Sequence, residues 1–128
     1  MSQNIRRFED AEVRQDARKI TKTIYQISTK EAFSKDWGLV DQVRRASVSI
    51  MANIAEGSER LSSKEFVQYL GIASASAAEV RSHLYIAYDL GYVSQEQLNA
   101  LIKALESVAR QLKGLRRSLV PSTSTSTS

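Results

Sequence analysis

The chain has 128 residues, enough for one domain with a hydrophobic core, and 42% of them are hydrophobic while 25% are charged. It contains no cysteine, which excludes disulfides, thiolate metal sites and cysteine nucleophiles and fits a reducing cytoplasm. The net charge of +4 and the pI of about 9.5 permit a nucleic acid or another anionic partner.

Residues 1–8 lack the apolar core of a secretory signal, and no later run approaches the roughly 18 apolar residues of a membrane helix. We therefore expect a cytoplasmic protein without a membrane segment. The first helix is predicted from about residue 10 to residue 27. Apolar residues recur along it at helical spacing, namely Val13, Ala17, Ile20, Ile24 and Ile27.

The second helix is predicted from about residue 37 to residue 56, after a loop that contains residues 34–36. Its apolar stripe would be Leu39, Val43, Ala46, Ile50, Asn53 and Gly57. Gly57 stands where a helix often ends in a left-handed turn. Asn53 occupies a position where the pattern asks for Leu or Ile, and Glu56 follows near the same face. Since burying an unpaired amide costs roughly 2–7 kcal/mol, these polar groups must have partners.

The third and fourth predicted helices each begin at a capping box, Ser62 with Glu65 and Ser94 with Gln97. Gly91 closes the third helix. The apolar stripes are Phe66, Leu70, Ala73, Ala77, Val80, Leu84 and Ala87 in the third helix, and Leu98, Leu101, Leu105, Val108, Leu112, Leu115 and Leu119 in the fourth.

No segment alternates with a period of two residues, so the sequence predicts an all-α domain. Short loops favour an antiparallel up-down-up-down four-helix bundle over residues 1–120. Residues 121–128 form a low-complexity Ser/Thr tail, which we expect to be disordered. A remnant of the reading frame is an open explanation for its origin. Residues 71–78 are small on nearly every face, which indicates either packing of a second subunit or plain alanine helix propensity.

A candidate polar site lies around the end of the second helix. The sequence favours a buried polar network that fixes this helix end over a catalytic site, because nothing indicates a cleft shared by two carboxylates. The network residues are Asn53, Glu56, Arg60 and Glu79. Glu79 and His83 indicate a helix-stabilising pair, since one histidine and one carboxylate are too few to hold a metal. There is also no Gly-rich phosphate loop, and we predict no metal, no cofactor and no enzymatic activity.

Basic residues supply candidate nucleic-acid contacts. No acidic residue follows Glu106, so the cations after it either complement a helix C-terminus or form a binding patch. Multiplied around an oligomer, such residues would form a continuous positive surface. The candidates are Arg6, Arg7, Arg44, Arg45, Arg110, Lys113, Arg116 and Arg117.

The order of these motifs resembles a known family. Trp-Gly-Leu-Val-Asp-Gln-Val-Arg-Arg-Ala at residues 37–46 precedes Asn-Ile-Ala-Glu-Gly at residues 53–57, and Asp-Leu-Gly-Tyr follows at residues 89–92. Over residues 8–119 the chain resembles the four-helix-bundle proteins encoded in intervening sequences of bacterial 23S ribosomal RNA genes. Matched by motif, the family positions are Arg44, Arg45, Asn53, Glu56, Gly57, Arg60 and Glu79.

The resemblance implies a ring-like homopentamer and a similarity to accessory proteins of diversity-generating retroelements, which bind a reverse transcriptase and nucleic acid. RNA binding is suggested by the genomic location of the family. The chain departs from the family pattern at Arg14, where an aromatic residue is usual, and at Met51, where a proline is usual. Leucine is usual near Ser74 and Ala77, so the packing of the assembly is expected to differ.

Three functions remain open from the sequence. The first is a non-catalytic oligomer that binds RNA or DNA, which the basic excess and the resemblance favour. The second is a protein-interaction module, for example a partner of a reverse transcriptase. The third is an enzyme that uses Asn53, Glu56 and Glu79, for which only the expected buried polarity speaks.

Overall fold

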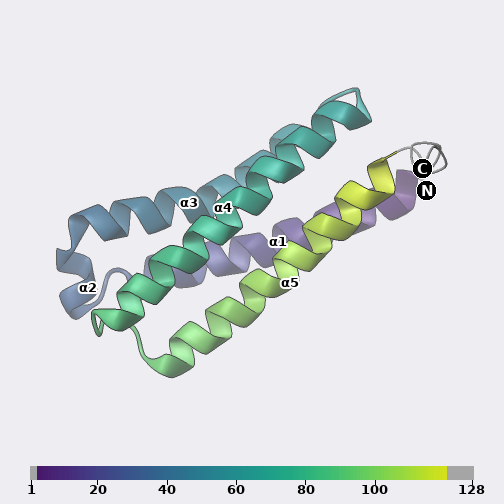
Figure 1. Cartoon of the computed structure of the whole chain (residues 1–128). Coiled ribbons are helices and arrows are strands. Elements are labelled where there is room, and N and C mark those ends of the chain that lie inside the picture. The colour runs from purple at the N-terminus through teal and green to yellow at the C-terminus, as the bar shows by residue number, and fades with distance from the viewer. Residues whose placement is uncertain (1–2, 121–128) are drawn as a thin grey trace, which may run out of the picture.

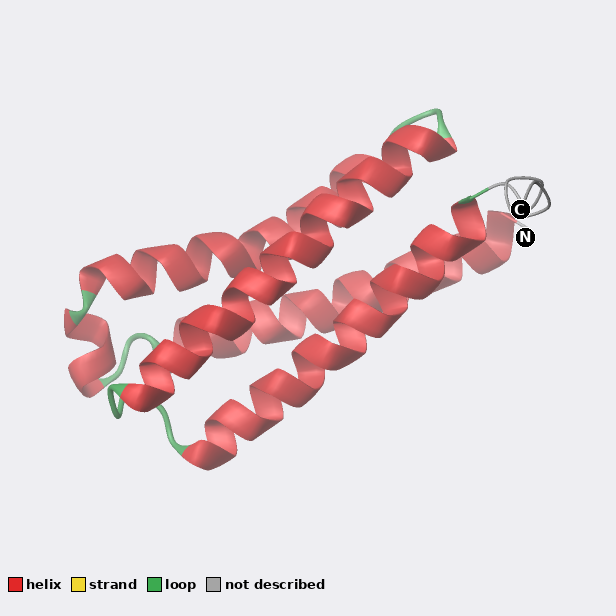
Figure 2. Ribbon diagram, viewed as in Figure 1, coloured by secondary structure: helices red, strands yellow, loops and turns green. Residues whose placement is uncertain are grey.

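A computed structural model describes the backbone of residues 3–120 and the side chains of residues 10–120. Four long helices lie side by side (Figure 1): α1 (Gln3–Ile27), α3 (Trp37–Ser58), α4 (Ser63–Asp89) and α5 (Gln95–Leu119). A short helix, α2 (Glu31–Lys35), connects α1 to α3. Within the described range no residue belongs to a strand (Figure 2), which confirms the predicted all-α fold.

The long helices form a closed ring of contacts. Each long helix runs opposite to the one before it, so α1 begins and α5 ends at the same end of the bundle (Figure 1). Contacts join α1 to α3, α3 to α4, α4 to α5 and α5 back to α1, and the α3–α4 contact is the most extensive. The Ser/Thr tail of residues 121–128 lies outside the described residues, so the prediction of its disorder stays a prediction.

The core consists of the apolar stripes that the sequence predicts. All of the predicted stripe positions of α1 and α4 are buried, and those of α5 are buried up to Leu115. In α3 the stripe takes Ile54, which is fully buried, where Asn53 was predicted. With 3.6 residues per turn, a step of four after Ile50 keeps the apolar face aligned with the core, and Asn53 then falls on its flank.

Three predicted helix boundaries are wrong, and the first is the start of α1, which lies at Gln3 and not at about residue 10. The predicted loop before α3 contains the helix α2, because Phe33 is buried there and its ring stacks on Tyr92 with centroids 5.3 Å apart. Gly57 does not end α3 in a left-handed turn, since the helix continues to Ser58. Gly57 is instead buried at the contact between α3 and α4, next to Phe66 and Tyr69.

The predicted helix stop at Gly91 and the capping box at Ser94 are confirmed, whereas at Ser62 only one of the two hydrogen bonds of the predicted capping box forms. Ser62 Oγ accepts the amide of Glu65, and Ser94 forms the reciprocal capping box with Gln97. Gly91 adopts a positive φ of 77°, a conformation that glycine adopts without steric cost. Asp36 caps α3 by accepting the amide of Leu39, and its other carboxylate oxygen accepts the hydroxyl of Tyr92 at 2.9 Å.

Candidate polar site and basic surface

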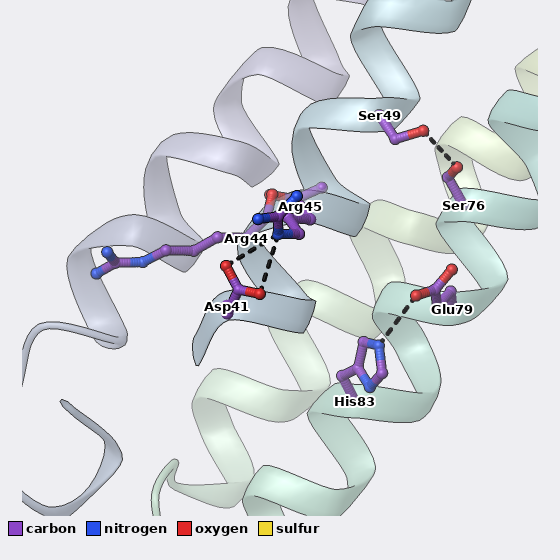
Figure 3. Close-up of polar contacts among 8 residues, drawn as sticks. Asp41, Arg44, Arg45, Ser49, Ser76, Glu79 and His83 are labelled. Atoms are coloured by element: carbon purple, nitrogen blue, oxygen red, sulfur yellow. Dashed lines mark hydrogen bonds and ion pairs between the residues drawn. The ribbon is translucent and has the colours of Figure 1, made fainter. Parts of the chain in front are cut away.

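Asn53 belongs to a small hydrogen-bonded cluster between α3 and α4. It is half-buried, and its Nδ2 donates to the Ser49 carbonyl at 2.8 Å and to Ser49 Oγ at 2.9 Å. Ser49 Oγ in turn lies 2.8 Å from Ser76 Oγ of α4 (Figure 3). Ser76 is buried, so this bridge fixes the register between the two helices at their middle.

Glu56 and Arg60 form a second, separate cluster at the α3–α4 turn. Arg60 Nη2 donates to Glu56 Oε1 at 3.0 Å and to the Tyr69 hydroxyl at 2.8 Å. The Arg60 guanidinium also lies over the Tyr69 ring, 4.9 Å from its centroid. The Glu56 side chain is 54% exposed, so the prediction that it is buried is wrong. The prediction therefore gives the correct position of Glu56 along α3, three residues after Asn53, but the wrong degree of burial.

Glu79 and His83 pair on α4, as the sequence predicts, with Glu79 Oε2 at 3.3 Å from His83 Nε2 (Figure 3). Glu79 is exposed, which contradicts its place in a buried network. Ser49 and Ser76 lie at the same level of the antiparallel helices α3 and α4. Glu56 follows Ser49 by seven residues, and Glu79 follows Ser76 by three residues in the opposite direction. At 1.5 Å per residue, Glu56 and Glu79 are therefore about 15 Å apart along the bundle. The predicted four-residue network is therefore divided among three clusters, and its two carboxylates share no cleft.

The neighbouring arginines Arg44 and Arg45 have different surroundings. Arg44 extends to the end of α1, where its Nε donates to Oγ of Ser28, just after the helix, at 2.9 Å, and its guanidinium lies 4.5 Å from the centroid of the Tyr25 ring. Arg45 is exposed, and its Nε lies 2.9 Å from both carboxylate oxygens of Asp41. Figure 3 shows the Arg44 side chain directed away from the Asp41–Arg45 pair. Arg44 thus holds α1 against α3, while Arg45 faces solvent.

The basic residues of α5 also differ in their exposure. Arg110, Lys113 and Arg117 are exposed on one side of the helix, within about two turns of each other. Arg116 is half-buried and lies against α4, where its Nη2 would be 3.7 Å from a Cβ at Gly71. We call Arg110, Lys113 and Arg117 the α5 basic face. The side chains of Arg6 and Arg7 lie outside the described residues.

Sequence reasoning named Arg44 and Arg45 as candidate nucleic-acid contacts but missed the basic and aromatic surface that they share with Tyr25 and Trp37 along the outer side of α1 and α3. Arg14 and Arg18 line a hollow beside Met51. Tyr25, Arg44 and Arg45 line a second hollow of about 680 Å³, and Trp37 lines a third next to Arg44. The spacing of Arg14, Arg18 and Tyr25 on the flank of the α1 apolar stripe was the signal that could have found it.

Tyr92 is a titratable group with a shifted pKa. Its hydroxyl donates to the Asp36 carboxylate, and this hydrogen bond raises the pKa of Tyr92 above 10.0, with burial and the negative charge of Asp36 acting in the same direction. The contact joins the α4–α5 loop to the start of α3, so it is a structural contact at the end of the bundle.

Neither a metal site nor a membrane-spanning helix is found among the described residues. Within residues 10–120 no group of three or more His, Asp and Glu side chains is placed to hold a metal ion. Across the described helices, no segment is both long and apolar enough to cross a membrane.

The sequence model of the 23S rRNA-intervening sequence protein family matches residues 9–114. Among solved structures, the chain is similar to a protein of unknown function of the S23 ribosomal protein family from Bacteroides thetaiotaomicron, with a TM-score of 0.78 and 21% identity over 85% of this chain and 98% of that chain. At this identity the likeness shows a common fold. No curated protein matches the sequence.

Proposed function

The chain belongs to the 23S rRNA-intervening sequence protein family, and from this premise we propose that it is a non-catalytic, ring-forming oligomer that binds RNA in the cytoplasm through its basic surface. The ring would be the homopentamer that the family resemblance implies. The observation that carries the proposal is the α5 basic face, where three cations share one exposed side of a rigid helix. Repetition of this face in an assembly would sum weak phosphate contacts into useful affinity.

The arrangement of the α5 basic face supports recognition of the nucleic-acid backbone. The helix contains no aromatic residue, and the face presents only Arg and Lys to a partner. Such side chains contact phosphates and do not read sequence unless they reach a groove. Recognition is therefore expected to follow the charge and shape of a folded RNA.

The outer face of α4 supports self-association. Ile72, Tyr85 and Ile86 are exposed there, and the small residues Ala75 and Ala78 lie exposed between them. Ile72, Ala75, Glu79, Ser82 and Ile86 follow one another at helical spacing on the side away from the core, so this face is mainly apolar or small with one carboxylate within it. A surface of this kind marks an interaction site more often than an isolated exposed apolar residue does.

A second candidate function uses the same apolar face. If the outer face of α4 binds a different protein, the chain is an interaction module, for example an accessory subunit of a reverse transcriptase. The separation of Glu56 from Glu79 argues against the enzyme hypothesis, because acid–base catalysis needs both groups within reach of one substrate.

The experiment is a salt titration of binding to a structured RNA, with duplex DNA as the comparison. We expect affinity to fall steeply with salt, with a log–log slope of about −0.7 to −0.9 for each phosphate neutralised. Replacing the α5 basic face by Arg110→Ala, Lys113→Ala and Arg117→Ala should flatten the slope and leave the melting temperature unchanged.

A charge-matched control removes three exposed cations from separate places, by Lys35→Ala, Lys64→Ala and Arg81→Ala. This control should keep most of the slope if the α5 basic face binds RNA. Equal loss in both variants would show that net charge alone attracts RNA. Absence of binding to RNA and DNA at low salt would reject the nucleic-acid proposal and favour the protein-interaction module.

A further inference from the structure

The outer side of α1 and α3 carries aromatic and cationic side chains together. We define the α1–α3 face by Arg18 and Tyr25 of α1 and by Trp37, Arg44 and Arg45 of α3. Two hollows on this face, of about 470 Å³ and 680 Å³, both have Asp41 and Arg44 in their walls, so they adjoin each other. The first contains Trp37 and the second contains Tyr25 and Arg45.

The aromatic groups of this face are unusually accessible. Trp37 stands at the first position of α3 and is 81% exposed, although indole is among the side chains that gain most from burial. Tyr25 is 41% exposed, with Arg44 held over its ring. The hydrogen bond from Arg44 to Ser28 keeps this stacked pair in place before any ligand arrives.

The cations of the face are available to an anion. Arg18 and Arg45 are exposed, and Arg45 is opposed by Asp41 in a solvent-exposed pair. Such exposed pairs contribute little to stability, so a phosphate can replace the carboxylate at little cost. Arg14 is opposed by Asp10 at 3.4 Å and adds less.

This combination differs in kind from the α5 basic face. Stacking on an aromatic side chain requires a base whose face is free, which a duplex does not offer and a single strand does. The residues of α5 can hold phosphates, whereas the α1–α3 face can hold phosphates and bases at once.

We infer that the α1–α3 face binds single-stranded nucleic acid, with a base stacked on Trp37 and the backbone following Arg45 and Arg18 toward the other end of α1. The inference rests on the proposed nucleic-acid function and assigns it a second, strand-selective surface. The chemistry is shared by RNA and DNA, since both strands offer a phosphate backbone and base faces.

Trp37 makes the test direct, because it is the only tryptophan of the chain. The intact protein is titrated with an unstructured RNA oligonucleotide, with the same sequence as DNA, and with its duplex, while tryptophan emission and affinity are recorded. We expect saturable quenching by the single strands and little by the duplex. A larger effect of the RNA arm would assign the source as RNA, and a larger effect of the DNA arm would assign it as single-stranded DNA.

Variants separate stacking from charge. Trp37→Ala should weaken single-strand binding about 5- to 140-fold, which corresponds to one stacked base at about 1–3 kcal/mol, and Trp37→Phe should recover part of the loss. Leu61→Ala is the control, since Leu61 is fully exposed at the opposite end of α3. Arg18→Ala should flatten the salt dependence of single-strand binding with unchanged stability.

The outcomes distinguish this inference from the proposed function. Single-strand binding without quenching, unchanged affinity of Trp37→Ala, or equal quenching by the duplex would overturn the inference and leave RNA binding by the α5 basic face intact. Tryptophan emission that shifts to the red on dilution of the free protein would also overturn it, because Trp37 would then be covered by a second copy. If single strands quench the tryptophan emission but structured RNA does not bind, only the proposal for the α5 basic face is rejected.

Discussion

A Cβ atom on Gly57 of α3 would lie 2.7 Å from Cβ of Tyr69 in α4 and 2.8 Å from Cδ1 of Phe66. Distances this short do not occur between side chains, so the backbones of α3 and α4 approach as closely as they do because residue 57 has no side chain. The glycine lies within the helix and is buried. Its role is close packing of the α3–α4 pair.

We predict that Gly57→Ala destabilises the protein by about 1–3 kcal/mol, the usual cost of overpacking, even though alanine is the better helix former. The measurement is urea unfolding followed by circular dichroism. Gly114→Ala is the matched control, because Gly114 is exposed within the last third of α5 and a Cβ there meets no atom within 4 Å. That control should be stabilised by about 0.5–1 kcal/mol. Stabilisation of both variants would contradict the close approach.

Replacing Glu56 tests its corrected position. Glu56→Ala should cost less than about 1 kcal/mol, because the ion pair with Arg60 is on the surface. Arg60→Ala should cost more, about 1–2 kcal/mol, since it also removes the hydrogen bond to Tyr69 and the contact with its ring. Thermal unfolding at one pH gives both values. A larger loss for Glu56→Ala than for Arg60→Ala would restore the buried-network interpretation.

The pair of Tyr92 and Asp36 should make stability sensitive to alkaline pH. The pKa of Tyr92 is raised above 10.0 in the folded chain, so the folded state holds this proton more tightly than the unfolded state. Its contribution is fully present below pH 10 and is lost as the pH rises through the folded pKa. The stability difference between the parent and Tyr92→Phe should therefore shrink above about pH 10. A difference that is constant with pH would show that the hydroxyl does not titrate against Asp36.

Arg44 and Arg45 offer a test on adjacent residues. Arg44→Ala should destabilise the fold by about 1–3 kcal/mol, because it leaves the buried Ser28 hydroxyl without this donor and removes the cover of Tyr25. Arg45→Ala should change stability by less than about 1 kcal/mol, since its pair with Asp41 is exposed. Denaturant midpoints measure both, and similar losses would argue against the division of roles.

Self-association should depend on the outer face of α4. Ile72→Lys with Ile86→Lys should convert an oligomer into the monomer of 14.3 kDa in light scattering, because two charges would be placed where apolar surface is to be buried. Leu61→Lys, at the exposed α3–α4 turn, is the control and should leave the assembly unchanged. A monomeric parent would reject the oligomer proposal, and helix propensity would then explain the small residues at positions 71–78.

Local chemistry explains why much of the fold could be read from the sequence. The stripes of α1, α4 and α5 repeat at the helical period, and the caps at Ser62 and Ser94 satisfy amides within one turn. Such features depend on residues a few positions apart, so they need no knowledge of the partner helix. The pairing of Glu79 with His83 was predictable for the same reason.

The depth and grouping of polar residues required the tertiary structure. In α3 the positions Asn53 and Ile54 are both compatible with the helical period, and only the packing of α4 decides that Ile54 faces the core. Gly57 likewise looks like a helix end in sequence, and only the nearness of Tyr69 reveals a contact. The sequence by itself determined the four long helices and most of their apolar positions, because these follow from backbone geometry and burial of apolar area. The α3–α4 approach, the separation of Glu56 from Glu79 and the meeting of Trp37, Tyr25 and Arg44 on one surface were decided by helix packing, which joins residues far apart in the chain.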